Sequence, residues 1–231
     1  MHDQCKNMYG YRMLSAVAAR SARTDGRLAR SAGTRTAVVD ALLALLHEGD
    51  LRPTAPRIAA RAGISLRSVF QHFPDMEAIF AAVADRQTAR IRAASRPIPP
   101  HAPLAARIAT LVAQRARIFD MIAPVRRAAL LMEPFSPEIA KRLRGARVVA
   151  RREIEIVFAA ELRARRAGER SELLAALDVA ASWAAWEALR MQQGLSAARA
   201  RNAMTRTLSA LLTERRETRG RKFNGHATNA R

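Results

Sequence analysis

The stretch that decides the fold is TAPRIAARAGISLRSVFQHF, residues 54–73. Its spacing predicts two short helices, about Ala55 to Ala62 and Leu66 to His72, with Gly63 between them. Glycine adopts a left-handed backbone at no steric cost, as a tight turn requires, and Ser65 is a favoured N-cap for the second helix. Two short helices joined by such a turn indicate a helix-turn-helix.

The second helix is predicted to have two distinct faces, since successive residues turn by about 100° around its axis. The residues expected to pack inward are Val69, Phe73 and Leu66. Those expected to face outward are Arg67 and Gln71, flanked by Ser68 and Phe70. Arginine pairs with guanine, glutamine pairs with adenine, and aromatic groups contact thymine methyls. The outward face therefore favours contacts to DNA bases, although arginine and glutamine on an exposed face are often only solvated.

The rest of the chain is also predicted to be helical, because no period-two apolar pattern occurs. Thr34 is expected to cap a first helix that stops at Gly49, and Asp75 a helix to about Ala94. Four prolines within Arg96–Pro103 exclude a helix there and mark a boundary. The later helices are expected at Leu104–Phe119, which Pro124 would end, and then at Val125–Met132, Ser136–Arg166, Ser171–Gln193 and Ser196–Arg215.

The chain of 231 residues is strongly basic, with a net charge of +20 and 37 arginines against three lysines. Residues 1–33 carry +4, 34–95 carry +2, 96–214 carry +9 and 215–231 carry +5. Nucleic acid is the commonest partner for such a charge, and an anionic membrane surface comes second. The expected organisation is a basic flexible arm (1–33), a helix-turn-helix domain (34–95), a larger helical domain (104–215) and a basic disordered tail (216–231).

Several classes of function find no support in the sequence. The one cysteine, Cys5, excludes an intrachain disulfide, and no apolar run is long enough for a transmembrane helix. The five histidines show no metal-ligand spacing, and no phosphate-binding loop or nucleophile motif occurs. We therefore expect no enzyme activity, no metal and no cofactor, in a protein of the cytoplasm that does not bind membranes.

From about Thr34 to Phe80 the chain resembles the TetR/AcrR family of bacterial transcriptional repressors. The resemblance lies in TRTAVVDALLALLHEGD (34–50), RIAARAGIS (57–65) and VFQHFPDMEAIF (69–80). It implies an all-α fold in which an N-terminal helix-turn-helix DNA-binding domain precedes a larger helical ligand-binding and dimerisation domain. It also implies a homodimer that binds double-stranded DNA at a palindromic operator and is released by a small-molecule inducer.

The resemblance also implies which residues contact DNA. Base-facing positions fall on Leu66, Arg67, Ser68, Phe70, Gln71 and His72, and helix-start contacts fall on Thr54, Arg57 and Ser65. Two departures remove expected phosphate contacts, because Phe70 replaces a common tyrosine and Met76 a common lysine. We expect the basic arm to replace them through Arg20, Arg23, Arg27 and Arg30, so that deletion of residues 1–30 flattens the salt dependence of binding by ~0.9 in slope per contact.

For the second domain, the resemblance implies a dimer interface and a ligand pocket. The expected interface residues are Trp183, Trp186, Leu208 and Leu211, with the subunit's own core as the alternative. The expected pocket residues are Phe119, Met121, Met132, Phe135 and Phe158, and ordinary core is again the alternative. Because few polar residues interrupt them, we expect an apolar inducer.

The sequence therefore favours a sequence-specific transcriptional regulator, most simply a repressor. One alternative is a low-specificity architectural DNA-binding protein driven by net charge, which would bind operator and random DNA alike. Another is a basic helical protein on anionic membrane, which leaves the base-facing pattern of residues 66–72 unexplained.

Overall fold

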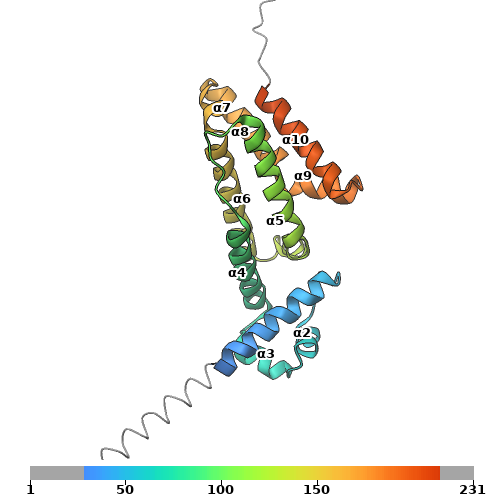
Figure 1. Ribbon diagram of the computed structural model, residues 1–231. Coiled ribbons are helices and arrows are strands. Elements are labelled where there is room, and N and C mark those ends of the chain that lie inside the picture. Colours follow the sequence, from blue (N-terminus) through green and yellow to red (C-terminus); the bar gives the residue numbers. More distant parts are fainter. Residues whose placement is uncertain (1–28, 214–231) are drawn as a thin grey trace, which may run out of the picture. The chain divides into compact units, whose positions relative to one another are not determined.

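The computed structural model describes residues 29–213, which are helical with no strand (Figure 1). This confirms the all-α prediction, with the helix-turn-helix near the N-terminus. The described chain divides into two compact units. Unit 1 comprises residues 29–95 and 120–145, and unit 2 comprises residues 96–119 and 146–213. The arm residues 1–28 and the tail from residue 214 lie outside the described range.

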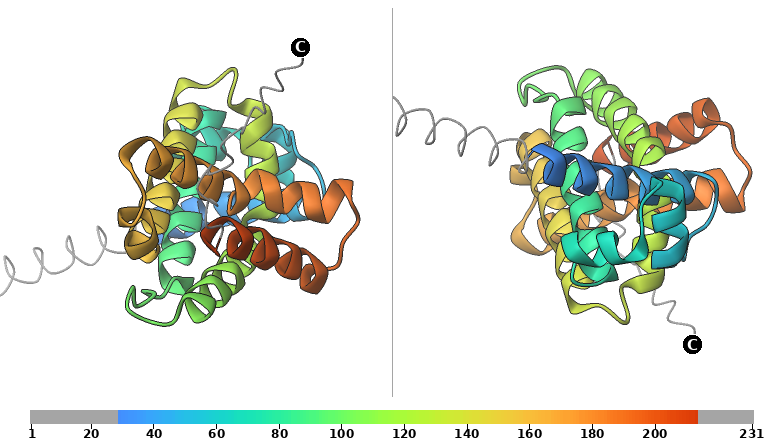
Figure 2. Two further views of the ribbon diagram at one scale, coloured as in Figure 1. Left: turned by 90° about the horizontal axis from the view of Figure 1, so that it is seen from above. Right: turned by 90° about the horizontal axis from the view of Figure 1, so that it is seen from below.

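Unit 1 contains the helix-turn-helix and the helices that pack on it. They are a first helix over residues 29–47, α2 (Ala55–Ala62), α3 (Leu66–His72), α4 (Met76–Ala94), the second part of α5 (Leu104–Met132) and the first part of α6 (Pro137–Val157). The right view of Figure 2 shows the first helix with α2 and α3. One apolar core joins these elements, from Val38 and Leu42 through Val69 and Phe73 to Leu143. Burial of this shared core positions α3 in the domain.

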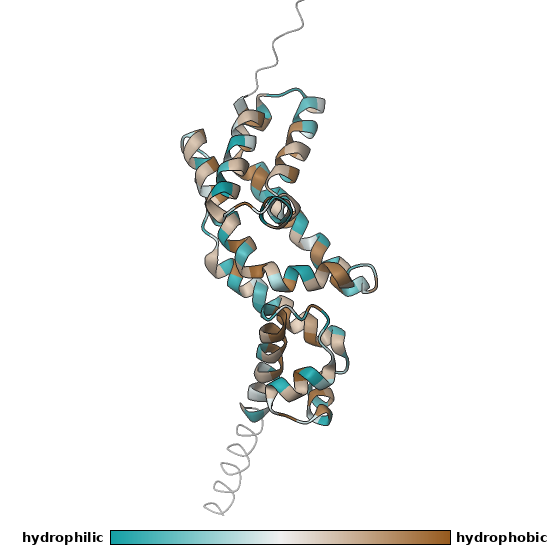
Figure 3. Cartoon of the chain, turned by 90° about the vertical axis from the view of Figure 1, so that its right-hand side faces the viewer, coloured by the Kyte–Doolittle hydropathy of each residue, from teal (hydrophilic) through white to brown (hydrophobic). Residues whose placement is uncertain are grey.

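Unit 2 contains the remaining parts of α5 and α6 and the C-terminal helices. These are α7 (Ala159–Arg163), α8 (Ala167–Ala180), α9 (Trp183–Glu187), the π-helix η1 (Ala188–Gln192) and α10 (Ala197–Thr213). α10 packs against α8 and η1, in the orange and red group of Figure 2, left. Many helices carry both polar and apolar residues (Figure 3), as helices with one buried face do.

Most of the predicted helix ends are confirmed. The hydroxyl of Ser65 accepts from the Ser68 amide at 3.1 Å, and the Asp75 carboxylate accepts from the Ala78 amide at 2.7 Å. Gly63 has φ +67°, a left-handed backbone that a side chain would strain. Ser136 and Ser196 cap α6 and α10 in the same way, and Gly49 and Gly194 have positive φ after the helices they end.

Two predicted breaks in the first half of the chain are wrong. Thr34 is not an N-cap, because the helix already includes residue 29 and the Thr34 hydroxyl donates to the Arg30 carbonyl at 3.0 Å. Pro124 does not end a helix, because α5 continues through it to Met132. The proline removes one amide donor from the helix, but buried Val125 and Ala128 carry the apolar face onward into the unit 1 core.

Two predicted long helices of unit 2 are interrupted instead. α6 ends at Val157, whose carbonyl accepts from Nη1 of Arg107 at 2.6 Å. The stretch expected as Ser171–Gln193 breaks after Ala180, where the Ala181 carbonyl accepts from Nη1 of Arg115 at 2.9 Å. Both arginines belong to α5, and both side chains are buried. Each arginine donates a hydrogen bond to a carbonyl at a break between helices. The local sequence at these two breaks does not predict them.

The same two arginines form ion pairs inside unit 2. Arg107 pairs with Glu161, with Nη2 2.5 Å from Oε1, and Arg115 pairs with Glu153, with Nη2 3.0 Å from Oε2. The hydrogen bond from Arg107 lowers the pKa of Glu161 and outweighs the opposing effect of burial. The side chain of Gln114 adds a bond to Glu153 at 3.1 Å. Unit 2 is therefore built around satisfied buried charges.

No helix of the described residues is long and apolar enough to cross a membrane.

Candidate nucleic-acid interface

The recognition helix α3 presents the predicted polar face to solvent. Val69 and Phe73 are buried in the unit 1 core, whereas Arg67 and Gln71 are exposed on the other side of the helix. Ser68 is half-buried, and its amide donates to the Ser65 hydroxyl. The two side chains best suited to base recognition are therefore free of the core.

Two apolar side chains accompany this face. Phe70 is 45% exposed, as expected for a flanking position, and Leu66 is 40% exposed. The expectation that Leu66 packs inward is therefore wrong. Leu66 is the first residue of a seven-residue helix, at the end away from the Val69 and Phe73 contacts with the core. Both exposed groups can contact thymine methyls.

An arginine of the first helix holds the other end of α3. Arg35 donates from Nη1 to the carbonyl of His72, and its guanidinium carbon lies 4.2 Å from the centroid of the Phe73 ring. The sequence gives no local signal for this role of Arg35, because its partner His72 lies 37 residues further along the chain. His72 itself is half-buried, with Nδ1 3.4 Å from the Ser31 hydroxyl.

The residues at the start of α2 differ in their present partners. Thr54 is the N-cap by position, but its hydroxyl makes no capping hydrogen bond and the residue is exposed. Arg57 pairs with Asp50, with Nε 3.2 Å from Oδ2, and Arg61 pairs with Glu48 at 2.6 Å. Acidic residues next to α2 thus offset its arginines, in keeping with the small net charge of residues 34–95.

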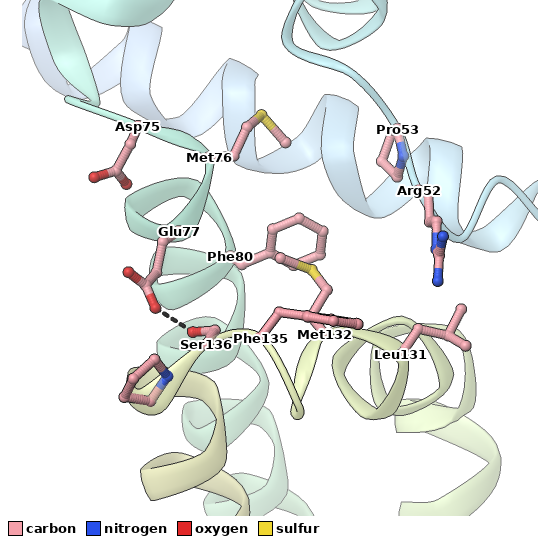
Figure 4. Close-up of a pocket in the computed structure, with 11 residues that line it drawn as sticks. Arg52, Pro53, Asp75, Met76, Glu77, Phe80, Leu131, Met132, Phe135 and Ser136 are labelled. Carbon is pink, nitrogen blue, oxygen red and sulfur yellow. Dashed lines mark hydrogen bonds between the residues drawn. The ribbon is translucent and has the colours of Figure 1, made fainter.

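The residues predicted for a ligand pocket are distributed over both units. Phe119 and Phe158 are buried in unit 2, where Phe119 packs edge-on against Trp183 at a centroid distance of 5.8 Å. Met121 belongs to unit 1 and is half-buried. Met132 and Phe135 also belong to unit 1 and line a groove of about 640 Å³ beside the start of α4 (Figure 4).

The residues predicted for a dimer interface fall into two groups. Trp186 and Leu208 are buried within the single chain, in line with the alternative that they form the subunit's own core. Trp183 and Leu211 are half-buried. On α8, the helix before these two, Val179 is 69% exposed.

Comparison with known proteins agrees with this geometry. Residues 38–83 match the family model described as bacterial regulatory proteins, tetR family. This range covers the recognition helix and most of the first helix, and extends into α4. No curated protein matches the sequence.

Two solved structures share the fold at low sequence identity. A transcriptional regulator from Rhodococcus sp. Rha1 is 20% identical with a TM-score of 0.54, and the match covers 79% of this chain and 95% of that chain. A structure described as a TetR-family transcriptional regulator from Mesorhizobium loti MAFF303099 is 17% identical with a TM-score of 0.53, over 79% of this chain and 96% of that chain. The match to the tetR family therefore covers residues 38–83, in unit 1, and the two solved structures show that the chain shares their fold.

Proposed function

We propose that this protein is a TetR-family repressor that binds a palindromic operator as a homodimer and leaves it when a small ligand binds. The observation that carries the proposal is the pair Arg67 and Gln71, exposed on α3 opposite the buried Val69 and Phe73. A helix held by its apolar face, with these two groups outward, suits the major groove of DNA.

The proposed base contacts follow from the chemistry of the exposed face. The guanidinium of Arg67 reads guanine O6 and N7, and the side-chain amide of Gln71 reads adenine N6 and N7. Leu66 and Phe70 contact thymine methyls on either side of them. Ser68 and His72 are half-buried, so we assign them supporting contacts at the edge of this surface.

Contacts to phosphate are proposed at the start of α2 and from the arm. The Thr54 hydroxyl is exposed and does not cap α2, so it is available to a phosphate oxygen. Arg57 would exchange its pairing with Asp50 for a phosphate when DNA arrives. Arg20, Arg23 and Arg27 of the arm lie outside the described residues, whereas Arg30 lies in the first helix. Phosphate contacts by all four remain part of the proposal.

A homodimer is proposed because α3 has only seven residues and reaches few base pairs. Two copies related by a twofold axis read a palindrome and multiply the discrimination. We assign the interface to the outward sides of α8 and α10, with Val179 and Leu211 as contacts and Trp183 beside them. The buried Trp186 and Leu208 support these helices from within.

Release by a ligand is proposed as a shift between two states of the dimer. A ligand favours the non-binding state only if it binds that state more tightly. Repression follows if the operator overlaps a promoter.

Selection of fragments from a random duplex library, at physiological salt, tests the proposal. The expected result is a palindromic motif that the Arg67→Ala variant no longer selects. Fragments without a common motif, bound equally by the variant, would instead support the architectural DNA-binding alternative, which the +20 charge favours. In that case net charge alone would explain binding.

A further inference from the structure

A groove in unit 1 lies between the helix-turn-helix and the turn that joins α5 to α6. Its volume is about 640 Å³, which is in the range of sites for small organic ligands. Figure 4 shows Arg52 and Pro53 on one side and Asp75, Met76 and Glu77 on the other. The groove therefore touches the chain just before α2 and just after α3.

The floor of the groove is apolar and partly uncovered. Phe135 is 82% exposed and Leu131 is 40% exposed, while Phe80 and Met132 lie deeper (Figure 4). Exposed aromatic and aliphatic groups gathered at one hollow mark a binding surface, because their burial is favourable. The apolar part of a small ligand would cover them.

The charged groups of the groove are not equivalent. The Asp75 carboxylate caps α4 through the Ala78 amide, and the Glu77 carboxylate accepts from the Ser136 hydroxyl. In contrast, the guanidinium of Arg52 makes no hydrogen bond or ion pair with any part of the chain that the structure describes. Figure 4 places this guanidinium on the Leu131 side, away from both carboxylates. Arg52 is therefore the charged group of the groove whose hydrogen-bond donors are left for a ligand.

We propose that this groove binds an amphipathic carboxylate, whose anionic end pairs with Arg52 and whose apolar body covers Phe135, Leu131 and Met132. A guanidinium binds a carboxylate through two parallel hydrogen bonds, which gives the site a preference for this head group. Methionine and phenylalanine side chains accommodate apolar bodies of varied shape. The +20 charge of the chain also draws anions toward the protein.

The place of the groove gives such a ligand a route to DNA binding. Arg52 and Pro53 lead into α2, and Asp75 and Met76 follow α3, so one bound molecule contacts both ends of the helix-turn-helix. This regulatory part rests on the proposed function, whereas binding of the carboxylate itself does not. If the ligand changes operator affinity, the operator must change ligand affinity by the same factor.

A fluorescent titration of the full-length protein tests the site without DNA. The probe is 11-(dansylamino)undecanoate, and its primary amide is the matched neutral probe with the same apolar body. We expect the carboxylate to bind about tenfold more tightly than the amide, as a charge-assisted hydrogen bond implies. Decanoate should displace the probe, and decyltrimethylammonium should not.

Variants then locate the site. Arg52→Gln should abolish the preference for the carboxylate, whereas Arg90→Gln, an equal charge change at an exposed position of α4, should keep it. Phe135→Ser should weaken both probes, and Val149→Ser, at a valine 71% exposed on α6, should weaken neither. All four positions are exposed, so the folded structure should tolerate them.

The outcomes separate the site from the regulation. Equal affinities for the two probes, or a preference that survives Arg52→Gln, would overturn the proposed site even if the protein binds a specific operator. A probe affinity unchanged by saturating operator would overturn the coupling. A protein that shows no sequence-specific DNA binding would contradict the proposed function. The probe titration, which uses no DNA, would still test the proposed carboxylate site.

Discussion

The guanidinium of Arg35 lies over the ring of Phe73, with its carbon atom 4.2 Å from the ring centroid. The same side chain donates to the carbonyl of His72, the last residue of α3. Arg35 thus joins the first helix to the end of the recognition helix by a cation–π contact and a hydrogen bond. In the proposed function, Arg35 is therefore a positioning residue for the side chains of α3 that would face the bases.

Replacement of Arg35 by methionine should therefore weaken operator binding with the salt dependence unchanged. Methionine keeps much of the length and apolar contact but loses the bond to His72. We expect a loss of about 1 kcal/mol, or roughly fivefold in operator affinity. Fluorescence anisotropy of a labelled operator at several salt concentrations measures both quantities. Arg144→Met, at an exposed position of α6, is the control.

Two results would contradict the positioning role of Arg35. A salt slope lowered by ~0.9 would make Arg35 a direct phosphate contact. Full recovery of affinity in Arg35→Lys would show that only its charge matters, since lysine lacks the planar fork of arginine.

Glu161 should make the stability of unit 2 depend on pH in the acid range. Its native pKa is lowered by Arg107, so its contribution is present above its ordinary value of 4.5 and is lost as pH falls through the native value. Glu161→Gln should be less stable than the wild type at neutral pH, by about 1–3 kcal/mol. Urea unfolding at several pH values should show this difference shrink below pH 4.5.

Glu172→Gln is the matched control for Glu161, because Glu172 is exposed on α8 and forms no ion pair among residues 29–213. Its stability difference from the wild type should stay small at every pH. A Glu161→Gln difference that is constant with pH would refute the account of the Arg107 pair.

Deletion of the basic arm should stop at residue 28, because residues 29 and 30 are already helical. The truncated protein should bind its operator more weakly, with a salt slope reduced by ~0.9 for each phosphate contact removed. Anisotropy titrations over a range of salt concentrations measure the slope. An unchanged slope would show that the arm contacts no phosphate.

The dimer proposal calls for substitution at an exposed residue, because charge at the buried Leu208 would disrupt the subunit itself. Val179→Glu should give monomers with weak operator binding, since it places a charge on the outward side of α8. Val149→Glu makes the same change at an equally exposed valine on α6 and should leave the dimer intact. Analytical ultracentrifugation distinguishes the two, and a persisting Val179→Glu dimer would place the interface elsewhere.

The helix-turn-helix was predictable from sequence because its determinants are local. The side chains of Ser65 and Asp75 accept hydrogen bonds from amides three residues away. Gly63 adopts the left-handed backbone of the turn, which glycine permits without strain. The inward side of α3 also followed from helical spacing for Val69 and Phe73. The prediction that Leu66 packs inward was wrong, because the exposure of a residue at a helix end depends on neighbouring segments that helical spacing does not describe.

The interruptions of unit 2 were not predictable in this way. Arg107 and Arg115 donate hydrogen bonds to carbonyls 50 and 66 residues away. The apolar pattern of the sequence near Val157 and Ala181 is unbroken, so it predicts continuous helices there. Pro124 predicts a helix end where none occurs, because tertiary packing of α5 outweighs the hydrogen bond that the proline removes. The groove was not predictable from the sequence either, because Arg52 and Phe135 are far apart in the chain and line one groove only in the folded structure.

One comparison of affinities tests whether α3 reads bases through Arg67. The dissociation constants for the selected operator and for a scrambled duplex are measured at physiological salt, for the wild type, Arg67→Ala and Arg144→Ala, the last at an exposed position of α6. The account predicts a wild-type preference of at least about a thousandfold. Arg67→Ala should lower that preference by a factor corresponding to about 1–3 kcal/mol for each half-site, and Arg144→Ala should preserve it. Equal ratios for the wild type and Arg67→Ala would contradict the account.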